Sequence, residues 1–435
     1  MTNGSALRIM YHEKSCASCF LRLPSGWTWG VRSVRQNKGR PDRLTMAKFR
    51  WNNRYRDIVR DRLSVFKEGL MVTIERFGHG GDVWTAAEAF GRSSGEFVDF
   101  SANINPLGPP PSVMARLAEE LEGIIHYPDP GHRRMKEALS RRLQVGSEQL
   151  LIGNGAAECM ALAILAHAPR AVGVVAPCFS EYEALSRQFG ADVVRVIGQA
   201  SRDYLADWPD LERLMADADV VFLGQPNNPT GAVYERRVLE DAGRLAERNG
   251  TLLIMDEAFI DFLPDEEEAS LLRFAAASRN VLVIRSLTKF YAIPGLRLGY
   301  AAGHPDTIRA LASKQVTWSV NGLALAAGEA LLLDEAADDY AERTRSLIAG
   351  EREWLCGQLT ALGLRLWTSR ANFLLVEAAA PWSARRLQEE LGRRGVLIRN
   401  CDGYAGLGAG HFRIAVKDRQ ANKRLVEALQ AVLHL

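Results

Sequence analysis

Short apolar runs alternate with longer helical stretches between residues 150 and 285, and this alternation constrains the fold more than any other feature. Runs such as 252–255 and 281–284 are rich in branched aliphatic side chains, which is typical of strands buried on both faces. Strands that alternate with helices predict a mostly parallel sheet with helices on both faces. We therefore expect a three-layer α/β domain, with strands at 172–176, 192–197, 219–224, 251–256 and 281–285 and helices at 156–167, 179–189, 208–216, 234–248 and 268–277.

The pattern changes after residue 301. Helical stretches come first, and short strands with two further helices follow, which indicates a smaller α+β domain. We expect helices at 305–314, 320–332, 334–362, 382–393 and 418–433, and strands near 364–367, 373–377, 396–399 and 411–416. The predicted division is an extension at 1–70, a segment at 71–120 that joins the small domain, a large domain at 121–305 and a small domain at 306–435.

Composition narrows the class of protein. The chain has 435 residues, of which 47% are hydrophobic and 24% charged, which is typical of a globular protein with a large core. No apolar run reaches the roughly 18 residues that span a bilayer, and the N-terminus lacks the apolar core of a signal peptide. The six cysteines show no disulfide framework. We expect a cytoplasmic protein that does not bind membranes.

The first 70 residues differ in charge from the rest. They contain 15 Lys/Arg and 5 Asp/Glu, a balance of +10, whereas residues 71–435 contain 39 and 47, a balance of −8. A basic arm for nucleic acid and half of a zinc site at Cys16 and Cys19 are possible functions. The interpretation we favour is a disordered extension without function, because Lys67-Glu-Gly69 is what a ribosome-binding site would encode. We hypothesise that translation starts at Met71 or at the Val72 codon.

Lys289 lies in Ser286-Leu-Thr-Lys-Phe-Tyr-Ala-Ile-Pro-Gly-Leu-Arg-Leu-Gly-Tyr300, directly after an apolar strand. A partly buried lysine beside positive charge has a lowered pKa and suits Schiff-base chemistry with an aldehyde. Ser286, Thr288 and Arg297 add two hydroxyls and a cation, which suit a phosphate monoester. An aldehyde beside a phosphate indicates pyridoxal 5'-phosphate as the cofactor. We expect no metal.

This stretch resembles the lysine segment of the fold-type I aminotransferase superfamily. It is most similar to the threonine-phosphate decarboxylases of cobalamin synthesis, whose near relatives are the histidinol-phosphate aminotransferases. The resemblance covers residues 71–435, including Phe100-Ser-Ala-Asn-Ile-Asn-Pro-Leu-Gly108 and Asp256-Glu-Ala-Phe-Ile-Asp-Phe262. It implies a fold-type I enzyme with a large PLP-binding domain, a small α+β domain and a small-molecule substrate.

The resemblance also implies roles for the cofactor-binding residues. Gly155 and Ala156, in Gly153-Asn-Gly-Ala, begin a helix whose N–H groups bind phosphate. Phe179 matches the aromatic that stacks on the pyridine ring, Asn228 the donor to the ring oxygen, and Asp256 the partner of the ring nitrogen. Tyr127 matches the tyrosine that reaches the cofactor of the neighbouring subunit, which implies a homodimer with shared active sites.

The substrate residues follow from the same resemblance. Arg413 matches the ligand of the α-carboxylate and Arg399 that of the substrate phosphate. His79, Asn105 and Asn372 match positions near the same substrate groups, although structural roles for them are open alternatives.

Three functions remain to be distinguished. Phe259 stands where many aminotransferases have tyrosine, and this favours decarboxylation of O-phospho-L-threonine over histidinol-phosphate transamination. The choice depends on which Cα bond is held perpendicular to the cofactor ring. A rival from another class is a transcription regulator with an aminotransferase-like domain, but residues 1–70 contain no recognisable helix-turn-helix pattern.

Overall fold

The computed structural model describes residues 18–22, 28–32, 74–75 and 78–433, and it divides into the units Met1–Met71 and Val72–Leu435. In the first unit β1 (Ser18–Arg22) pairs with β2 (Thr28–Arg32) in an antiparallel hairpin. The sequence analysis did not predict this hairpin. Apart from this hairpin, which includes Cys19, the expected disordered extension lies outside the described ranges, as do Cys16 of the zinc half-site and the proposed start at Met71.

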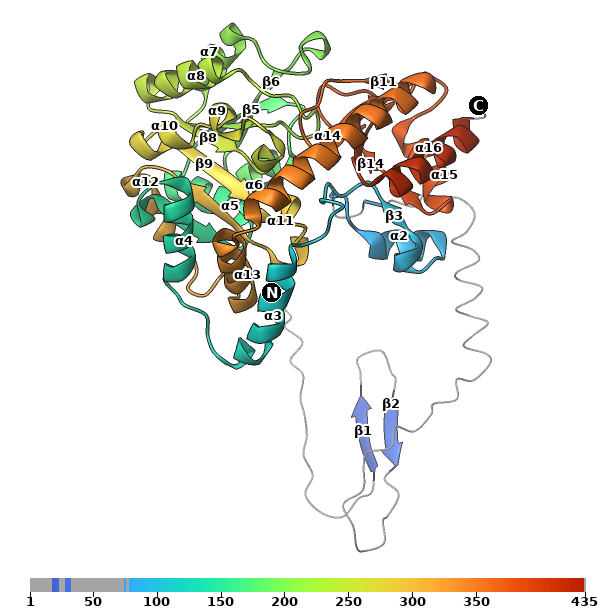
Figure 1. Cartoon of the computed structure of the whole chain (residues 1–435), viewed down its shortest axis with the longest axis horizontal. Helices are drawn as coiled ribbons and strands as arrows, with labels where there is room; N and C mark the ends of the chain where they lie inside the picture. Colours follow the sequence, from blue (N-terminus) through green and yellow to red (C-terminus); the bar gives the residue numbers. More distant parts are fainter. Residues whose placement is uncertain (1–17, 23–27, 33–73, 76–77, 434–435) are drawn as a thin grey trace, which may run out of the picture. The chain divides into compact units, whose positions relative to one another are not determined.

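A seven-stranded sheet forms the centre of the second unit, in the order β4-β10-β9-β8-β7-β5-β6 (Figure 1). Only β10 runs antiparallel to its neighbours in this sheet. The five strands predicted between 172 and 285 are confirmed, whereas β10 was missed because its sequence, Gly-Tyr-Ala-Ala, lacks β-branched residues. The bounds are β4 (Leu150–Gly153), β5 (Ala171–Ala176), β6 (Asp192–Ile197), β7 (Val220–Gly224), β8 (Leu252–Asp256), β9 (Val281–Ser286) and β10 (Gly299–Ala302).

Helices cover both faces of this sheet, as predicted. Successive side chains of a strand point to opposite faces, so Leu253 and Met255 join one core while Leu252 and Ile254 join the other. The first core is closed by α4 (Arg133–Leu143), α7 (Trp208–Asp217), α8 (Arg236–Asn249), α10 (Leu272–Ala277) and α13 (Gly322–Leu333). The second is closed by α5 (Ala156–His167), α6 (Ser180–Gln188) and α12 (Pro305–Ala312).

The smaller α+β domain contains an antiparallel sheet in the order β11-β12-β15-β14. Its strands are β11 (Arg365–Leu366), β12 (Phe373–Glu377), β14 (Arg399–Asn400) and β15 (His411–Ala415). Beside it β3 (Val98–Asp99) pairs in parallel with β13 (Val396–Leu397), so the chain before the large sheet does contribute a strand here. The helices of this domain are α2 (Val83–Phe90), α14 (Ala337–Ala361), α15 (Ala384–Arg393) and α16 (Arg419–Leu433).

The predicted boundary at residue 305 needs correction. Ile308 of α12 and Leu325 of α13 lie in the two cores of the large sheet, and α3 (Pro111–Glu120) packs against α13 through Val113. These helices therefore belong with the large domain, and the small domain begins near α14. Periodicity predicted the helices, but it does not say which core their apolar faces join.

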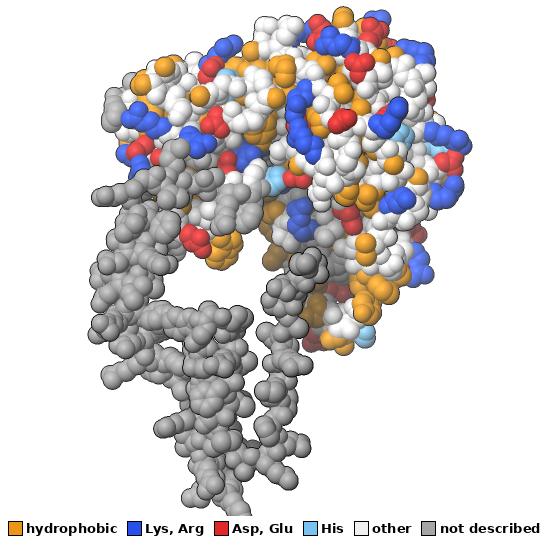
Figure 2. All heavy atoms as spheres, turned by 180° about the vertical axis from the view of Figure 1, so that it is seen from behind, with side chains coloured by type: hydrophobic (Ala, Val, Ile, Leu, Met, Phe, Trp, Pro, Cys, Tyr) orange, Lys and Arg blue, Asp and Glu red, His pale blue; other side chains and the backbone are white. Residues whose placement is uncertain are grey.

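The remaining elements are short. They are α9 (Glu266–Ala269), α11 (Leu287–Phe290) and 3₁₀ turns at Ser94–Glu96, Leu121–Ile125, Ser147–Gln149, Ala200–Arg202, Ile260–Phe262 and Pro294–Leu296. Among the helices of the described ranges, none is long and apolar enough to cross a bilayer. The part of the chain that the structure describes contains no cluster of three or more His, Cys, Asp or Glu that could hold a metal ion. On the face in Figure 2, basic and acidic side chains are interspersed.

Candidate active site

Strand register brings the predicted cofactor residues to one end of the large sheet. Gly299 at the start of β10 lies opposite Gly153 of β4 and opposite Ser286 of β9. α11, which contains Lys289, begins directly after Ser286, and Asp256 ends the neighbouring strand β8. The glycine turn, the hydroxyls and the lysine therefore lie at adjacent strand ends.

A cradle of suitable shape and charge for a phosphate lies at the start of α5. Gly155 has a φ of 85°, and a Cβ there would lie 2.8 Å from Nη2 of Arg297, so the guanidinium packs against the bare glycine. A Cβ on Gly299 would lie 2.7 Å from the N atom of Ala156. The first N–H groups of a helix have no intrahelical acceptor, which makes this end an anion site. The Ser286 Oγ lies 2.7 Å from the Oγ1 of Thr288, which adds buried hydroxyls nearby.

Lys289 has the electrostatics of a nucleophilic amine. Burial, followed by the positive charges of Arg297 and Arg413, lowers its pKa to about 8, and Asp256 opposes the shift. A sizeable fraction of the amine is therefore unprotonated near neutral pH. The backbone carbonyl of Lys289 accepts the N–H of Asn105 at 3.1 Å, which helps to fix the lysine segment.

Asp256 is held on both carboxylate oxygens. The Tyr182 hydroxyl donates to Oδ2 at 2.5 Å, and the Ala258 N–H donates to Oδ1 at 3.1 Å. Burial raises the pKa of Asp256 to about 6, although the Tyr182 hydrogen bond lowers it. Tyr182 is itself fixed by stacking on Phe222, with centroids 4.8 Å apart. The sequence analysis assigned no role to Tyr182, so its contact with Asp256 was missed.

Phe179 and Asn228 lie beside this cluster. Phe179 precedes α6, and its ring meets the Tyr182 ring edge-on, with centroids 5.7 Å apart. Asn228 is buried in the turn after β7, where its Oδ1 accepts a hydrogen bond from Nη1 of Arg413 at 2.5 Å. This bond links the proposed ring-oxygen donor to the proposed carboxylate ligand.

The two predicted substrate arginines lie opposite each other across β14 and β15. Arg413 also donates from Nη2 to the carbonyl of Ser101 at 2.7 Å. Arg399 forms an ion pair with Glu75, in which Nη1 of Arg399 lies 2.9 Å from Oε2 of Glu75. Both guanidinium groups are buried, so the pair forms a concentrated cationic edge.

Several polar atoms near this edge lack partners. Both amide atoms of Asn372, which is fully buried, and Nε of Arg413 form no hydrogen bond with any described residue. Buried polar groups are normally paired, so the unpaired Nε of Arg413 indicates a place for a polar ligand.

Asn105, one of the predicted substrate residues, is bound within the protein. The amide group of Asn105 donates to the Phe290 carbonyl, the Tyr340 hydroxyl and the Thr344 hydroxyl at 2.8–2.9 Å, so it holds the lysine segment and α14. This favours the structural alternative for Asn105 over substrate contact.

His79 and Tyr127 lie nearer the surface. Nε2 of His79 is 2.6 Å from Oε1 of Glu181, and its ring centroid is 6.1 Å from that of Phe179. Tyr127 is 80% exposed and stacks on Trp318, with centroids 4.6 Å apart. Its exposure is consistent with a role toward another subunit.

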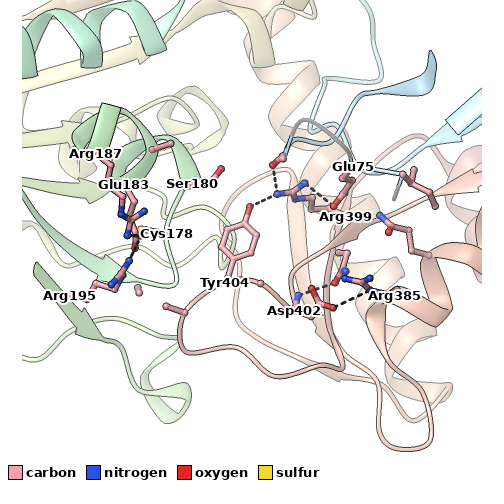
Figure 3. Close-up of a pocket in the computed structure, with 18 residues that line it drawn as sticks. Glu75, Cys178, Ser180, Glu183, Arg187, Arg195, Arg385, Arg399, Asp402 and Tyr404 are labelled. Carbon is pink, nitrogen blue, oxygen red and sulfur yellow. Dashed lines mark hydrogen bonds and ion pairs between the residues drawn. The ribbon is translucent and has the colours of Figure 1, made fainter. Parts of the chain in front are cut away.

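A cavity of about 440 Å³ adjoins the arginine edge. Figure 3 shows Glu75, Arg399 and Tyr404 on one side, and Ser180 and other residues of the β5–α6 region on the other. Lys289 and Asp256 are not among its lining residues. The cavity is therefore separate from the cofactor residues Lys289 and Asp256. Arg399, which lines the cavity and lies opposite Arg413 in the sheet, connects the cavity with the cofactor cluster.

The fold and these residues define a class of protein. The sequence family "Aminotransferase class I and II" matches residues 95–429, and the chain belongs to this family. The chain is 38% identical over 358 residues to threonine-phosphate decarboxylase of Salmonella typhimurium, covering 82% of this chain and 96% of the relative. It is 34% identical to histidinol-phosphate aminotransferase of Symbiobacterium thermophilum, covering 78% and 91%. The crystal structure of histidinol-phosphate aminotransferase from Clostridium acetobutylicum has a TM-score of 0.71 at 29% identity, covering 77% and 98%.

The residues fit pyridoxal 5'-phosphate, which is the cofactor of this family. The bare glycine beside the Arg297 guanidinium accepts a phosphate, and Lys289 supplies an amine. The carboxylate of Asp256, held by Tyr182, suits a protonated ring nitrogen. We expect Gly155, Ala156, Ser286, Thr288 and Arg297 to hold the phosphate.

Proposed function

We propose that the chain decarboxylates O-phospho-L-threonine to (R)-1-amino-2-propanol O-phosphate, the linker of the cobalamin nucleotide loop. The observation that carries this proposal is the pair of register-matched arginines, Arg399 and Arg413, beside Asn228. Two guanidinium groups at one edge suit a substrate with a carboxylate and a phosphate. The similarity to a threonine-phosphate decarboxylase over nearly its whole length supports the same substrate.

The proposed roles of the residues follow from their positions. When bound, pyridoxal 5'-phosphate supplies the electron sink for the bond pair that CO2 leaves behind. Arg413, fixed by Asn228 and Ser101, holds the α-carboxylate at one angle, so it selects which Cα bond breaks. Arg399 binds the distal phosphate. The Lys289 amine would be the group that returns a proton to Cα.

Phe259 supports decarboxylation over transamination. It is buried and packs edge-on against Phe373, with centroids 4.9 Å apart, so this side of the site is apolar. An aromatic hydroxyl is absent from position 259, where many aminotransferases have one. Histidinol-phosphate transamination is the second candidate, favoured by the similarity to that enzyme class.

The homodimer remains part of the proposal. Tyr127 and Trp318 belong to an apolar patch that is well exposed in the isolated chain, formed also by Leu121, Ile124, Ile125 and Val316. Exposed patches of this kind are typical of protein interfaces. A second subunit would cover the patch and bring Tyr127 toward the partner's site. A cytoplasmic location likewise stays a prediction.

One experiment tests the reaction. Residues 71–435 and the full chain are each purified with pyridoxal 5'-phosphate and given O-phospho-L-threonine without any keto acid. CO2 released in equal amount to aminopropanol phosphate supports the proposal. Amino transfer from histidinol phosphate to 2-oxoglutarate without release of CO2 would mean that the second candidate is correct.

A further inference from the structure

Arg399, the proposed phosphate ligand, already has an anionic partner within the chain. Its Nη1 lies 2.9 Å from Oε2 of Glu75, and both side chains are largely buried, with 7% of Arg399 and 14% of Glu75 exposed. Its Nη2 donates to the Gly78 carbonyl at 2.6 Å and to the Tyr404 hydroxyl at 3.2 Å. A phosphate that approaches Arg399 therefore meets a carboxylate in the same place (Figure 3).

The carboxylate of Glu75 is incompletely satisfied in this position. Its second oxygen, Oε1, is buried and has no hydrogen-bond partner in the described ranges. Burial raises the pKa of Glu75, although the charges of Arg399 and Arg413 lower it. A buried carboxylate oxygen without a donor costs free energy. The contact is therefore easier to replace than a fully bonded ion pair.

The other arginines of the cavity are also compensated by acids. Arg187 and Arg195 both bind Glu183, at 2.7 and 2.5 Å, and Arg385 lies 3.9 Å from Asp402. Each of these three arginines therefore already has an acidic neighbour when an anion enters the cavity.

A hydroxyl on the facing wall adds a donor for an anion. Oγ of Ser180, at the start of α6, is buried, lines the same cavity and forms no hydrogen bond within the described part of the chain. The cavity therefore has groups that suit a phosphate, but its binding requires an exchange of anions at Arg399.

We propose that Glu75 is an internal counter-ion of Arg399, which the phosphate group of the substrate displaces when it binds. The inference rests on the proposed function only in assigning a phosphate monoester to Arg399. Without substrate, Glu75 compensates a buried positive charge that would otherwise destabilise the domain. With substrate, the phosphate oxygens take over the hydrogen bonds of Arg399, and Glu75 leaves the guanidinium.

The test measures binding of inorganic phosphate to the cofactor-loaded enzyme, in which the cofactor's own phosphate site is filled. Isothermal titration compares the wild type with Glu75→Gln, because glutamine keeps the size of the side chain and removes its charge. We expect Glu75→Gln to bind phosphate about tenfold more tightly, since no competing carboxylate has to leave. Glu240→Gln, which makes the same charge change on the exposed face of α8, is expected to leave binding unchanged.

A second readout separates exchange from a general effect of charge. Glu75→Gln is expected to lower Tm in the absence of phosphate, because Arg399 loses its partner, and to show a larger rise in Tm on adding phosphate than the wild type. The double variant Glu75→Gln with Arg399→Gln is expected to lose the gain in affinity. If Glu75→Gln does not fold, Glu75→Asp withdraws the carboxylate by one methylene and is expected to give a smaller gain.

Equal or weaker phosphate binding by Glu75→Gln would overturn the inference, because Glu75 would then assist the anion or ignore it. The proposed function and the counter-ion role of Glu75 can be refuted independently of each other. Absence of CO2 from O-phospho-L-threonine together with tighter phosphate binding by Glu75→Gln would leave the counter-ion in place for a different phosphate substrate. Release of CO2 with unchanged phosphate binding would refute the counter-ion alone.

Discussion

The two halves of the candidate site differ in how completely the protein satisfies its own polar groups. At the end of the large sheet, both oxygens of Asp256 accept hydrogen bonds, and Ser286 and Thr288 bond each other. At the arginine edge of the small domain, Asn372 and Nε of Arg413 are buried without partners among the described residues. Asp256 and the two hydroxyls are thus already held by the chain itself, whereas the small domain retains buried polar groups without partners among the described residues.

This difference matches the proposed tasks. A cofactor that stays bound needs fixed groups, and buried strand ends followed by helices provide them. A substrate that enters and leaves needs groups whose hydrogen bonds can be exchanged. The difference leads to four predictions about variants, ordered by the size of the expected effect, and to a fifth about pH.

Replacing Lys289 by alanine should have the largest effect. The variant loses both the amine that binds the cofactor and the group that returns a proton, so CO2 release should fall by about 10³–10⁴-fold. Loss of the cofactor's absorbance after dialysis provides a second measurement. Lys423→Ala on the exposed face of α16 is the control. Retained turnover in Lys289→Ala would remove the lysine from the proposed chemistry.

Arg413→Gln should affect the substrate half of the candidate site more than the cofactor half. We expect kcat/KM for O-phospho-L-threonine to fall by about 10²–10³-fold, because a buried charged partner of the carboxylate is lost. Cofactor affinity should fall less, since Arg413 reaches the cofactor residues through Asn228 and contacts no group of the phosphate cradle. Steady-state kinetics and cofactor titration measure the two effects, with Arg393→Gln on the surface as control. Equal losses in kcat/KM and in cofactor affinity would show that the two halves of the site are not independent.

Asn105→Ala tests whether this residue is structural. Removing its three hydrogen-bond contacts to Phe290, Tyr340 and Thr344 should cost about 1–3 kcal/mol in the free energy of unfolding, because these buried groups lose a partner. Denaturant unfolding measures this. An increase in KM without loss of stability would instead support the substrate contact that the sequence predicted.

Tyr182→Phe should have the smallest effect, and its sign depends on pH. The Tyr182 hydroxyl lowers the pKa of Asp256, which burial raises to about 6, so its removal raises that pKa further. A protonated Asp256 pairs poorly with a protonated ring nitrogen. In the wild type, cofactor binding should therefore weaken as the pH falls through about 6. In the variant, this weakening should begin at a higher pH. A rise of about one pH unit in this pKa would make binding at pH 7 about twofold weaker. An unchanged pH profile would limit Tyr182 to packing.

The same pKa predicts how the cofactor-free protein responds to pH. Because folding raises the pKa of Asp256 from about 4 to about 6, its contribution to stability is present at low pH and is lost as pH rises through this interval. Bound cofactor should reduce that loss by pairing with the ionised carboxylate. Comparing Tm between pH 4.5 and 7 with and without cofactor checks the sign.

The sequence by itself determined the order of elements and the residues at the strand ends. Apolar runs and helical periods depend only on local spacing, so the five parallel strands and Lys289, Asp256 and Asn228 after them were predictable. The resemblance added the arginines and the cofactor.

Only the tertiary structure decided which groups meet. β10, which aligns Gly153 with Ser286, has no strand signal of its own, and its place is set by its two neighbours. The contacts of Tyr182 with Asp256 and of Glu75 with Arg399 join residues 74 and 324 positions apart, and the hydrogen bond of Asn105 to Phe290 spans 185 positions. Packing determines such distant contacts, and local sequence spacing carries no record of them.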